Sequence, residues 1–217
     1  MHIYEGILSG TAHGNEILAA GAVFTAAGTA MGLYKLDYEQ IPQVAVLSSA
    51  FFVVSLIHVP LGPTSEHLVL CGLMGLILGW SAFPAILTAL LLQAVFFSFG
   101  GLTTLGLNTL IMALPAVVCY YLFGRAVRSR SETAVFMAGF LAGAIAVLLG
   151  AGISAGSLAL AGREFRDFGK VVIVLHIPLA VIEGFVTGSV VVLLRKVRPE
   201  LLGMTPPRPS SEESSHG

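Results

Sequence analysis

The first two residues, Met1 and His2, could together hold a transition-metal ion. If Met1 carries a free α-amine, that amine, the His2 backbone nitrogen and His2 Nδ1 can close two chelate rings around one ion. These three nitrogens leave one corner of a planar site for a second imidazole. Four nitrogens in a plane, one of them an ionised amide, suit Ni²⁺ and Cu²⁺ and are less favourable for Co²⁺, whereas Zn²⁺ prefers a tetrahedron and Mg²⁺ prefers oxygen.

The composition is that of a polytopic membrane protein. Hydrophobic residues make up 56% of the 217 residues and charged residues only 11%, with a mean hydropathy of +0.90, which is outside the balance of soluble domains. The net charge of −1 excludes nucleic acid as a partner. Because the chain is so apolar, membrane lipid is expected to surround it. Residues 1–15 contain no Lys or Arg, so we expect them to persist rather than be removed as a secretory signal.

Apolar stretches long enough to cross a bilayer predict an all-α bundle of about seven transmembrane helices. The predicted spans are residues 16–34, 41–60, 65–80, 82–99, 104–123, 133–160 and 171–194. The third and fourth are expected to form a hairpin that breaks near Gly79 and Pro84. The chain then divides into a metal-chelating tip (1–15), a transmembrane bundle (16–198) and a disordered cytosolic tail (199–217), because the tail is rich in Pro, Ser and Glu.

The basic residues predict the orientation of this bundle. With the N-terminus outside and the C-terminus inside, eight lie in inner segments (Lys35, Arg125, Arg128, Arg130, Arg195, Lys196, Arg198 and Arg208) and three in an outer one (Arg163, Arg166 and Lys170). The positive-inside rule favours this arrangement. It places Met1 and His2 on the outer side, together with the start of the third span.

His67, at the start of the third span, is the predicted fourth nitrogen donor. Glu66, Gln93, Asn108 and Glu183 are candidates for groups that hydrogen-bond the ligands, since a metal-bound histidine needs its other ring nitrogen fixed. Glu183 falls near the middle of the last span, where a charged side chain costs about 2.5–3.5 kcal/mol on insertion scales. Glu183 therefore needs a polar partner. It could support a metal ligand, or it could form a hydrogen bond that serves only the fold.

Two other functions compete with metal binding. Residues 152–156 match the G-x-S-x-G pattern and His176 follows on the next span, which could indicate an intramembrane serine hydrolase. That elbow requires a strand-to-helix turn, however, and this segment lies in an apolar helical run. A passive ion channel is the third class. The chain lacks a phosphate-binding G-x-x-x-x-G-K-[ST] motif, so we predict that it is not an enzyme and that any ATP hydrolysis occurs in other subunits.

Several segments resemble the NikM/CbiM family, the substrate-binding membrane components of nickel and cobalt transporters of the energy-coupling-factor type. They are residues 1–6 (MHIYEG), 66–68 (EHL), 93–97 (QAVFF) and 100–108 (GGLTTLGLN). The resemblance runs through most of the membrane region.

This resemblance implies a seven-helix bundle in the prokaryotic cytoplasmic membrane, with its N-terminal tip inserted to hold Ni²⁺ or Co²⁺. It assigns Met1, His2 and His67 as the ligands of the transported ion. It also implies partners: a transmembrane coupling protein similar to EcfT or CbiQ, ATPase subunits similar to CbiO, and a small accessory membrane subunit as a further candidate. Cobalt uptake for cobalamin synthesis is the alternative to nickel import.

Overall fold

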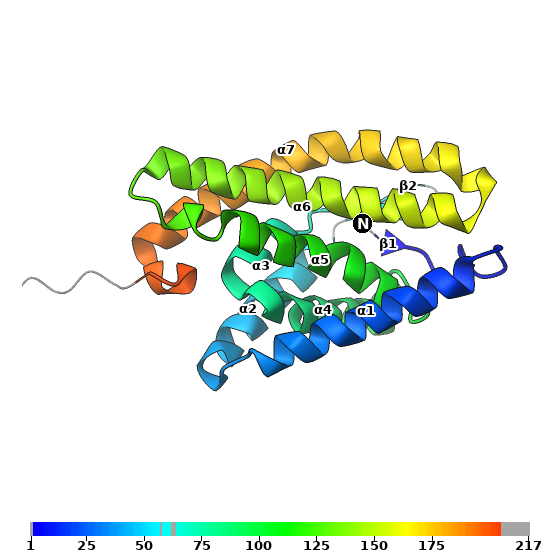
Figure 1. Ribbon diagram of the computed structural model, residues 1–217, viewed down its shortest axis with the longest axis horizontal. Helices are drawn as coiled ribbons and strands as arrows, with labels where there is room; N and C mark the ends of the chain where they lie inside the picture. The colour runs from blue at the N-terminus through cyan, green and yellow to red at the C-terminus, as the bar shows by residue number, and fades with distance from the viewer. Residues whose placement is uncertain (1, 57, 62–63, 205–217) are drawn as a thin grey trace, which may run out of the picture.

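The computed structural model describes residues 2–56, 58–61 and 64–204, and the side chains of all of these except 58–61, 64–66 and 164. Its helices are α1 (Gly14–Tyr34), α2 (Ile41–Val54), α3 (Cys71–Leu78), α4 (Ala82–Phe97), α5 (Leu105–Phe123), α6 (Glu132–Ala161) and α7 (Arg166–Val197). Its strands are β1 (His2–Ile3), β2 (His58–Leu61) and β3 (Thr64–His67). The longer helices lie roughly along one long axis (Figure 1), and both residues of β1 are buried.

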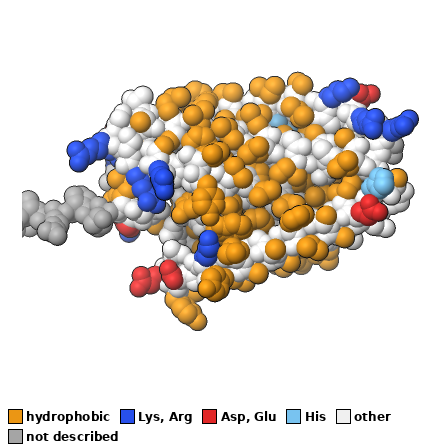
Figure 2. Space-filling view, in the orientation of Figure 1, with side chains coloured by type: hydrophobic (Ala, Val, Ile, Leu, Met, Phe, Trp, Pro, Cys, Tyr) orange, Lys and Arg blue, Asp and Glu red, His pale blue; other side chains and the backbone are white. Residues whose placement is uncertain are grey.

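The helical bundle is that of a multi-pass membrane protein. Within the described ranges, five helical segments are long and apolar enough to cross a bilayer: α1, the α3–α4 stretch Cys71–Phe97, α5, α6 and α7. Figure 2 shows hydrophobic side chains over the middle of the molecule and charged ones gathered at its two ends. Phe24, Phe96 and Leu160 are among the large apolar side chains exposed on the outer surface. The total of seven spans and the outward N-terminus stay predictions.

The second and third predicted spans are helical over only part of their length. Helix α2 ends at Val54 and α3 begins at Cys71, whereas the sequence predicted apolar helix to 60 and again from 65. Between them β2 and β3 form an antiparallel pair, and β3 also pairs with β1. Backbone at membrane depth must find its hydrogen bonds within the protein. This sheet supplies them. The predicted helical fold is confirmed, but the all-α prediction did not include these three short strands.

Helices α3 and α4 form the predicted hairpin. On α3, Gly75 lies against Ala116 of α5, and Gly79 lies against Tyr120, one helical turn further along the same neighbour. Gly79 then takes a positive φ of 53°, which favours glycine, and a 3-10 turn over Gly79–Ser81 reverses the chain. Helix α4 returns along α1, with Phe83 packed against Gly28.

The described basic residues, which exclude Arg208, lie in segments at the two ends of the bundle, in the two predicted groups. The α1–α2 turn, the α5–α6 turn and the end of α7 lie at one end, and the α6–α7 turn lies at the other (Figure 1). The segment predicted as a disordered tail begins with an ordered turn, Pro199–Leu202, whose Leu202 carbonyl accepts a hydrogen bond of 3.0 Å from Arg128 Nε. Residues 205–217 lie outside the described residues.

The close contact between α3 and α5 predicts a selective effect of adding one methyl group. A Cβ built on Gly75 would lie 2.0 Å from the Ala116 carbonyl oxygen, so Gly75→Ala should force the helices apart and destabilise the protein by about 1–3 kcal/mol. Gly152→Ala is the matched control, because a Cβ there meets nothing within 4 Å. We expect thermal unfolding in detergent to show a lower Tm for Gly75→Ala alone. Equal Tm values for the two variants would contradict this packing.

Candidate metal-binding site

The strand pairing brings His2 and His67 to one face of the sheet. In the register of β1 and β3, His2 lies opposite position 65, and His67 is two residues further along β3. Residues two apart in a strand share a face, and diagonal neighbours lie within reach of aromatic side chains. The two rings are 4.7 Å apart between centroids with planes at 33°, and each side chain is only 3% exposed. The predicted pair of imidazoles is therefore assembled and shielded from solvent.

Asn108 of α5 holds the N-terminal strand in place. Its Oδ1 accepts a 2.9 Å hydrogen bond from the Ile3 N–H, and its Nδ2 donates a 3.1 Å bond to the Ile3 carbonyl. The side-chain amide thus makes the two bonds that a neighbouring strand would make. Nδ2 also donates to Thr104 Oγ1 at 3.2 Å, which fixes the amide orientation. Asn108 consequently positions His2 through the adjacent residue.

The loop between α4 and α5 closes over the same segment. The Glu5 N–H donates to the Gly100 carbonyl, 2.6 Å away, and Glu5 Oε1 accepts from the Thr103 N–H at 3.2 Å. Gly100 and Gly101 have positive φ values of 74° and 117°. A Cβ on Gly100 would lie 2.9 Å from Asn108 Nδ2 and 3.3 Å from His2 Nδ1. Only glycine combines this backbone conformation with such a close approach.

The hydrogen bond of His67 determines which ring nitrogen is available to accept a proton or bind a metal. His67 Nδ1 lies 3.0 Å from the carbonyl oxygen of Leu68. A carbonyl oxygen only accepts, so Nδ1 carries the proton and Nε2 carries the lone pair. Metal-bound histidines in proteins commonly donate their second ring N–H to a carbonyl in this way.

The other predicted site residues fall into three groups. Glu183 of α7 is fully buried and accepts hydrogen bonds from the N–H groups of Val69 and Leu70, just after His67. Gln93 is equally buried, but it donates to Ser55 Oγ and so joins α4 to the end of α2. The Glu66 backbone pairs with Val59 between β3 and β2; its side chain is outside the described residues, as is Met1.

The spacing of the His2 and His67 rings suits a metal site in which both imidazoles bind the same ion. Two imidazoles bound cis on one ion, with metal–nitrogen bonds of about 2.0 Å, place their ring centres about 4.5 Å apart, close to the observed 4.7 Å. Within the described residues no three His, Cys, Asp or Glu side chains gather as a metal-ligating group.

The serine-hydrolase interpretation lacks its required geometry. Ser154 is 1% exposed and lies inside the continuous helix α6, with no strand-to-helix turn to present its hydroxyl. His176 lies on α7, where its Nδ1 is 2.6 Å from the Val172 carbonyl oxygen of its own helix.

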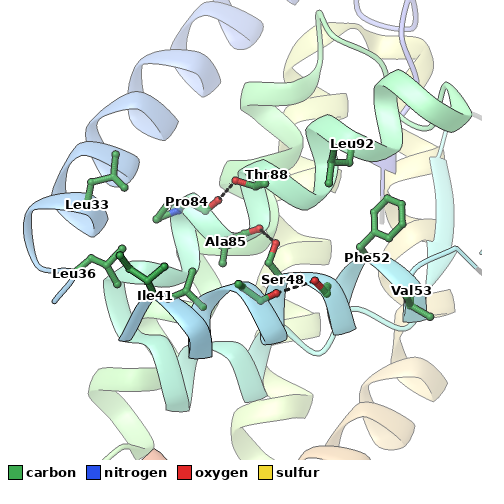
Figure 3. Close-up of a pocket in the computed structure, with 13 residues that line it drawn as sticks. Leu33, Leu36, Ile41, Ser48, Phe52, Val53, Pro84, Ala85, Thr88 and Leu92 are labelled. Atoms are coloured by element: carbon green, nitrogen blue, oxygen red, sulfur yellow. Dashed lines mark hydrogen bonds between the residues drawn. The ribbon is translucent and has the colours of Figure 1, made fainter. Parts of the chain in front are cut away.

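A groove between α1, α2 and α4 is unsuited to binding a metal ion. It has a volume of about 410 Å³ and is lined mainly by apolar side chains, including Leu33, Phe52 and Leu92 (Figure 3). Its hydroxyl groups already donate to helix carbonyls: Ser48 to Ala85 and Thr88 to Pro84, each at 2.8 Å. No charged side chain is among the residues that line the groove.

Known proteins share this fold and much of this sequence. A model of the family described as "Cobalt uptake substrate-specific transmembrane region" (CbiM) matches residues 2–201. A putative metal transport protein of Haemophilus influenzae is 42% identical, over 94% of this chain and 98% of its own. The cobalt transport protein CbiM of Sorangium cellulosum is 31% identical, over 93% and 94%. The fused nickel transport protein NikMN of Rhodobacter capsulatus is 33% identical over 77% of this chain, which covers 54% of that longer protein.

The architecture also matches crystal structures of transition-metal transporters. One superposes with a TM-score of 0.70 at 25% identity, covering 91% of this chain and 93% of that one. A truncated transition-metal transporter gives a TM-score of 0.68 over 92% of this chain and supports the fold alone, at 21% identity. The resemblance predicted from the sequence is thus confirmed, and the chain belongs to the CbiM family of nickel and cobalt transport components.

Proposed function

We propose that this chain captures Ni²⁺, with Co²⁺ as the alternative ion, outside a prokaryotic cytoplasmic membrane and releases it inward within an ATP-driven energy-coupling-factor complex. The observation that carries the proposal is the buried pair of imidazoles, His2 and His67, with centroids 4.7 Å apart beneath the folded-back N-terminal strand. Four nitrogens hold the ion: the Met1 amine, the His2 backbone nitrogen, His2 Nδ1 and His67 Nε2.

The donor chemistry favours nickel. One ionised amide and three neutral nitrogens in a plane suit a d⁸ ion that accepts square-planar coordination. The amidate also lowers the charge of the bound ion by one unit, which reduces the cost of burying it. The amide must lose its proton, and the amine and both imidazoles must be in their neutral forms, so binding weakens as pH falls. Some relatives are named for nickel transport and others for cobalt transport. The preference for nickel therefore rests on the coordination argument.

Transport requires partners that supply energy. The sequence contains no phosphate-binding loop, and the family is one of transport components rather than enzymes. We therefore assign ATP hydrolysis to separate ATPase subunits, connected to this chain by a transmembrane coupling protein. An accessory small membrane subunit would complete the assembly.

Blocking the N-terminal amine tests the proposal directly. Purified protein should bind one equivalent of nickel as a yellow, diamagnetic complex, which metal analysis and the absorption spectrum report together. A long N-terminal extension should abolish this binding, because it removes the amine and obstructs insertion of the tip. Retained stoichiometric binding in the extended protein would refute the chelate. Uptake into cells without the ATPase subunits would instead indicate a passive channel.

Removing the second imidazole should weaken binding and change the spectrum. We expect His67→Ala to lower nickel affinity by at least the roughly 10–100-fold that loss of a group supporting a ligand typically costs, and to shift the visible absorption band when water replaces the imidazole. His13→Ala is the control, because His13 is exposed and lies 3.1 Å from Glu16 at the start of α1. An unchanged spectrum in His67→Ala would mean that the fourth donor is another group.

The Asn108 clamp makes a separate prediction. Asn108→Leu removes both hydrogen bonds to Ile3 and should lower nickel affinity at least 10-fold, since buried backbone groups are left unpaired and the His2 ring loses its orientation. Thr109→Val on the same helix is the control, because the Thr109 hydroxyl donates to the Leu105 carbonyl of its own helix. Calorimetric titration measures the nickel affinity of both variants and of the unsubstituted protein. Wild-type affinity in Asn108→Leu would show that the clamp is dispensable.

A further inference from the structure

A continuous chain of hydrogen bonds connects His67 to a carboxylate on another helix. The His67 Nδ1–H donates to the Leu68 carbonyl at 3.0 Å. That carbonyl belongs to the same peptide group as the Val69 N–H, which donates to Glu183 Oε1. One peptide group therefore lies between the imidazole and the carboxylate, accepting from the first and donating to the second.

The carboxylate is held firmly at this point. Leu70 N–H also donates to Glu183, at 2.9 Å from Oε1 and 3.1 Å from Oε2. Leu70 itself has a positive φ of 50°, so the chain turns sharply into α3 where the carboxylate holds it. Helix α7 approaches α6 closely beside it, because a Cβ on Gly143 would lie 2.5 Å from the Glu183 carbonyl oxygen. Glu183 thus has little freedom to move.

Burial gives this chain of bonds its strength. Glu183 is 0% exposed and Val69 only 1%, so little water competes with these contacts. In such surroundings linked hydrogen bonds polarise one another. A carboxylate that accepts from the Val69 N–H makes the Leu68 carbonyl a stronger acceptor. That carbonyl in turn draws on the Nδ1 proton and increases electron density at Nε2, the nitrogen that would face the metal.

We propose that Glu183 is a positioning residue that strengthens His67 as a metal ligand through the peptide group between Leu68 and Val69. The inference rests on the proposed function, and it assigns this carboxylate a role in ion binding beyond joining α7 to the start of α3. It also couples α7 to the site, since a displacement of this helix would weaken the ligand without touching the ion.

A double-mutant cycle tests the relay. Glu183→Gln should lower nickel affinity about 10–100-fold, the range typical for groups that support a ligand, and should shift the visible band of the nickel complex. In a His67→Ala background the same change should alter affinity less than about two-fold, because no ligand remains for it to act through. Thr187→Val, one turn further along α7 and buried, is the matched control and should leave both readouts unchanged.

The outcomes separate this inference from the proposed function. Wild-type affinity and spectrum in Glu183→Gln would overturn the relay while leaving the nickel site standing. An equal loss with and without His67 would also overturn it, because the carboxylate would then act on the fold or on the charge as a whole. Failure of the wild-type protein to bind nickel would remove the proposed function and the relay with it.

A measurement on the unsubstituted protein covers the case in which Glu183→Gln does not fold. Nitrogen-15 NMR of protein labelled on histidine and valine, with the His67 and Val69 signals assigned by comparison with His67→Ala and Val69→Ile, reports which ring nitrogen carries the proton and follows the Val69 amide. The relay requires the Nδ1–H tautomer and a shift of the Val69 amide signal when diamagnetic nickel binds. A proton on Nε2 in the metal-free protein, or an unmoved Val69 amide, would overturn it.

Discussion

Burial of the N-terminal strand is the constraint on which the site depends. A peptide chain inside a membrane bundle must satisfy its backbone groups without water, and each unsatisfied group costs free energy comparable to a lost hydrogen bond. Here β3 pairs with one side of the strand and the Asn108 side chain bonds Ile3. Because of these bonds His2 can be buried, with only 3% of its surface exposed.

The same requirement explains why two helices are short. Helix α2 ends at Val54 and α3 starts at Cys71, so the hairpin of β2 and β3 can occupy the interior that longer helices would fill. Glycine makes the remaining close approaches, with Gly100 and Gly101 at positive φ where the α4–α5 loop meets Glu5 and His2. This irregular backbone lies next to His2, since a Cβ on Gly100 would lie 3.3 Å from His2 Nδ1.

Distant parts of the chain form hydrogen bonds next to each of the two proposed ligands. Asn108 on α5 positions His2 through Ile3, and Glu183 on α7 reaches His67 through the peptide that follows it. Gln93 strengthens the contact of α4 with α2 instead. Each imidazole therefore has its own support from a different helix, and relative motion of α5 and α7 would alter the geometry between the two rings.

The sequence by itself determined the apolar segments, the α3–α4 hairpin, the pair of histidines and the family, because these depend on local composition, spacing and donor chemistry. It also marked Asn108 and Glu183 as polar residues that need partners. Only the tertiary structure decided what those partners are, that Gln93 serves α2, and that a three-stranded sheet interrupts the second and third predicted spans. The physical reason is separation along the chain: Asn108 and Ile3 are 105 residues apart and Glu183 and Val69 are 114 apart, so packing rather than periodicity brings them together.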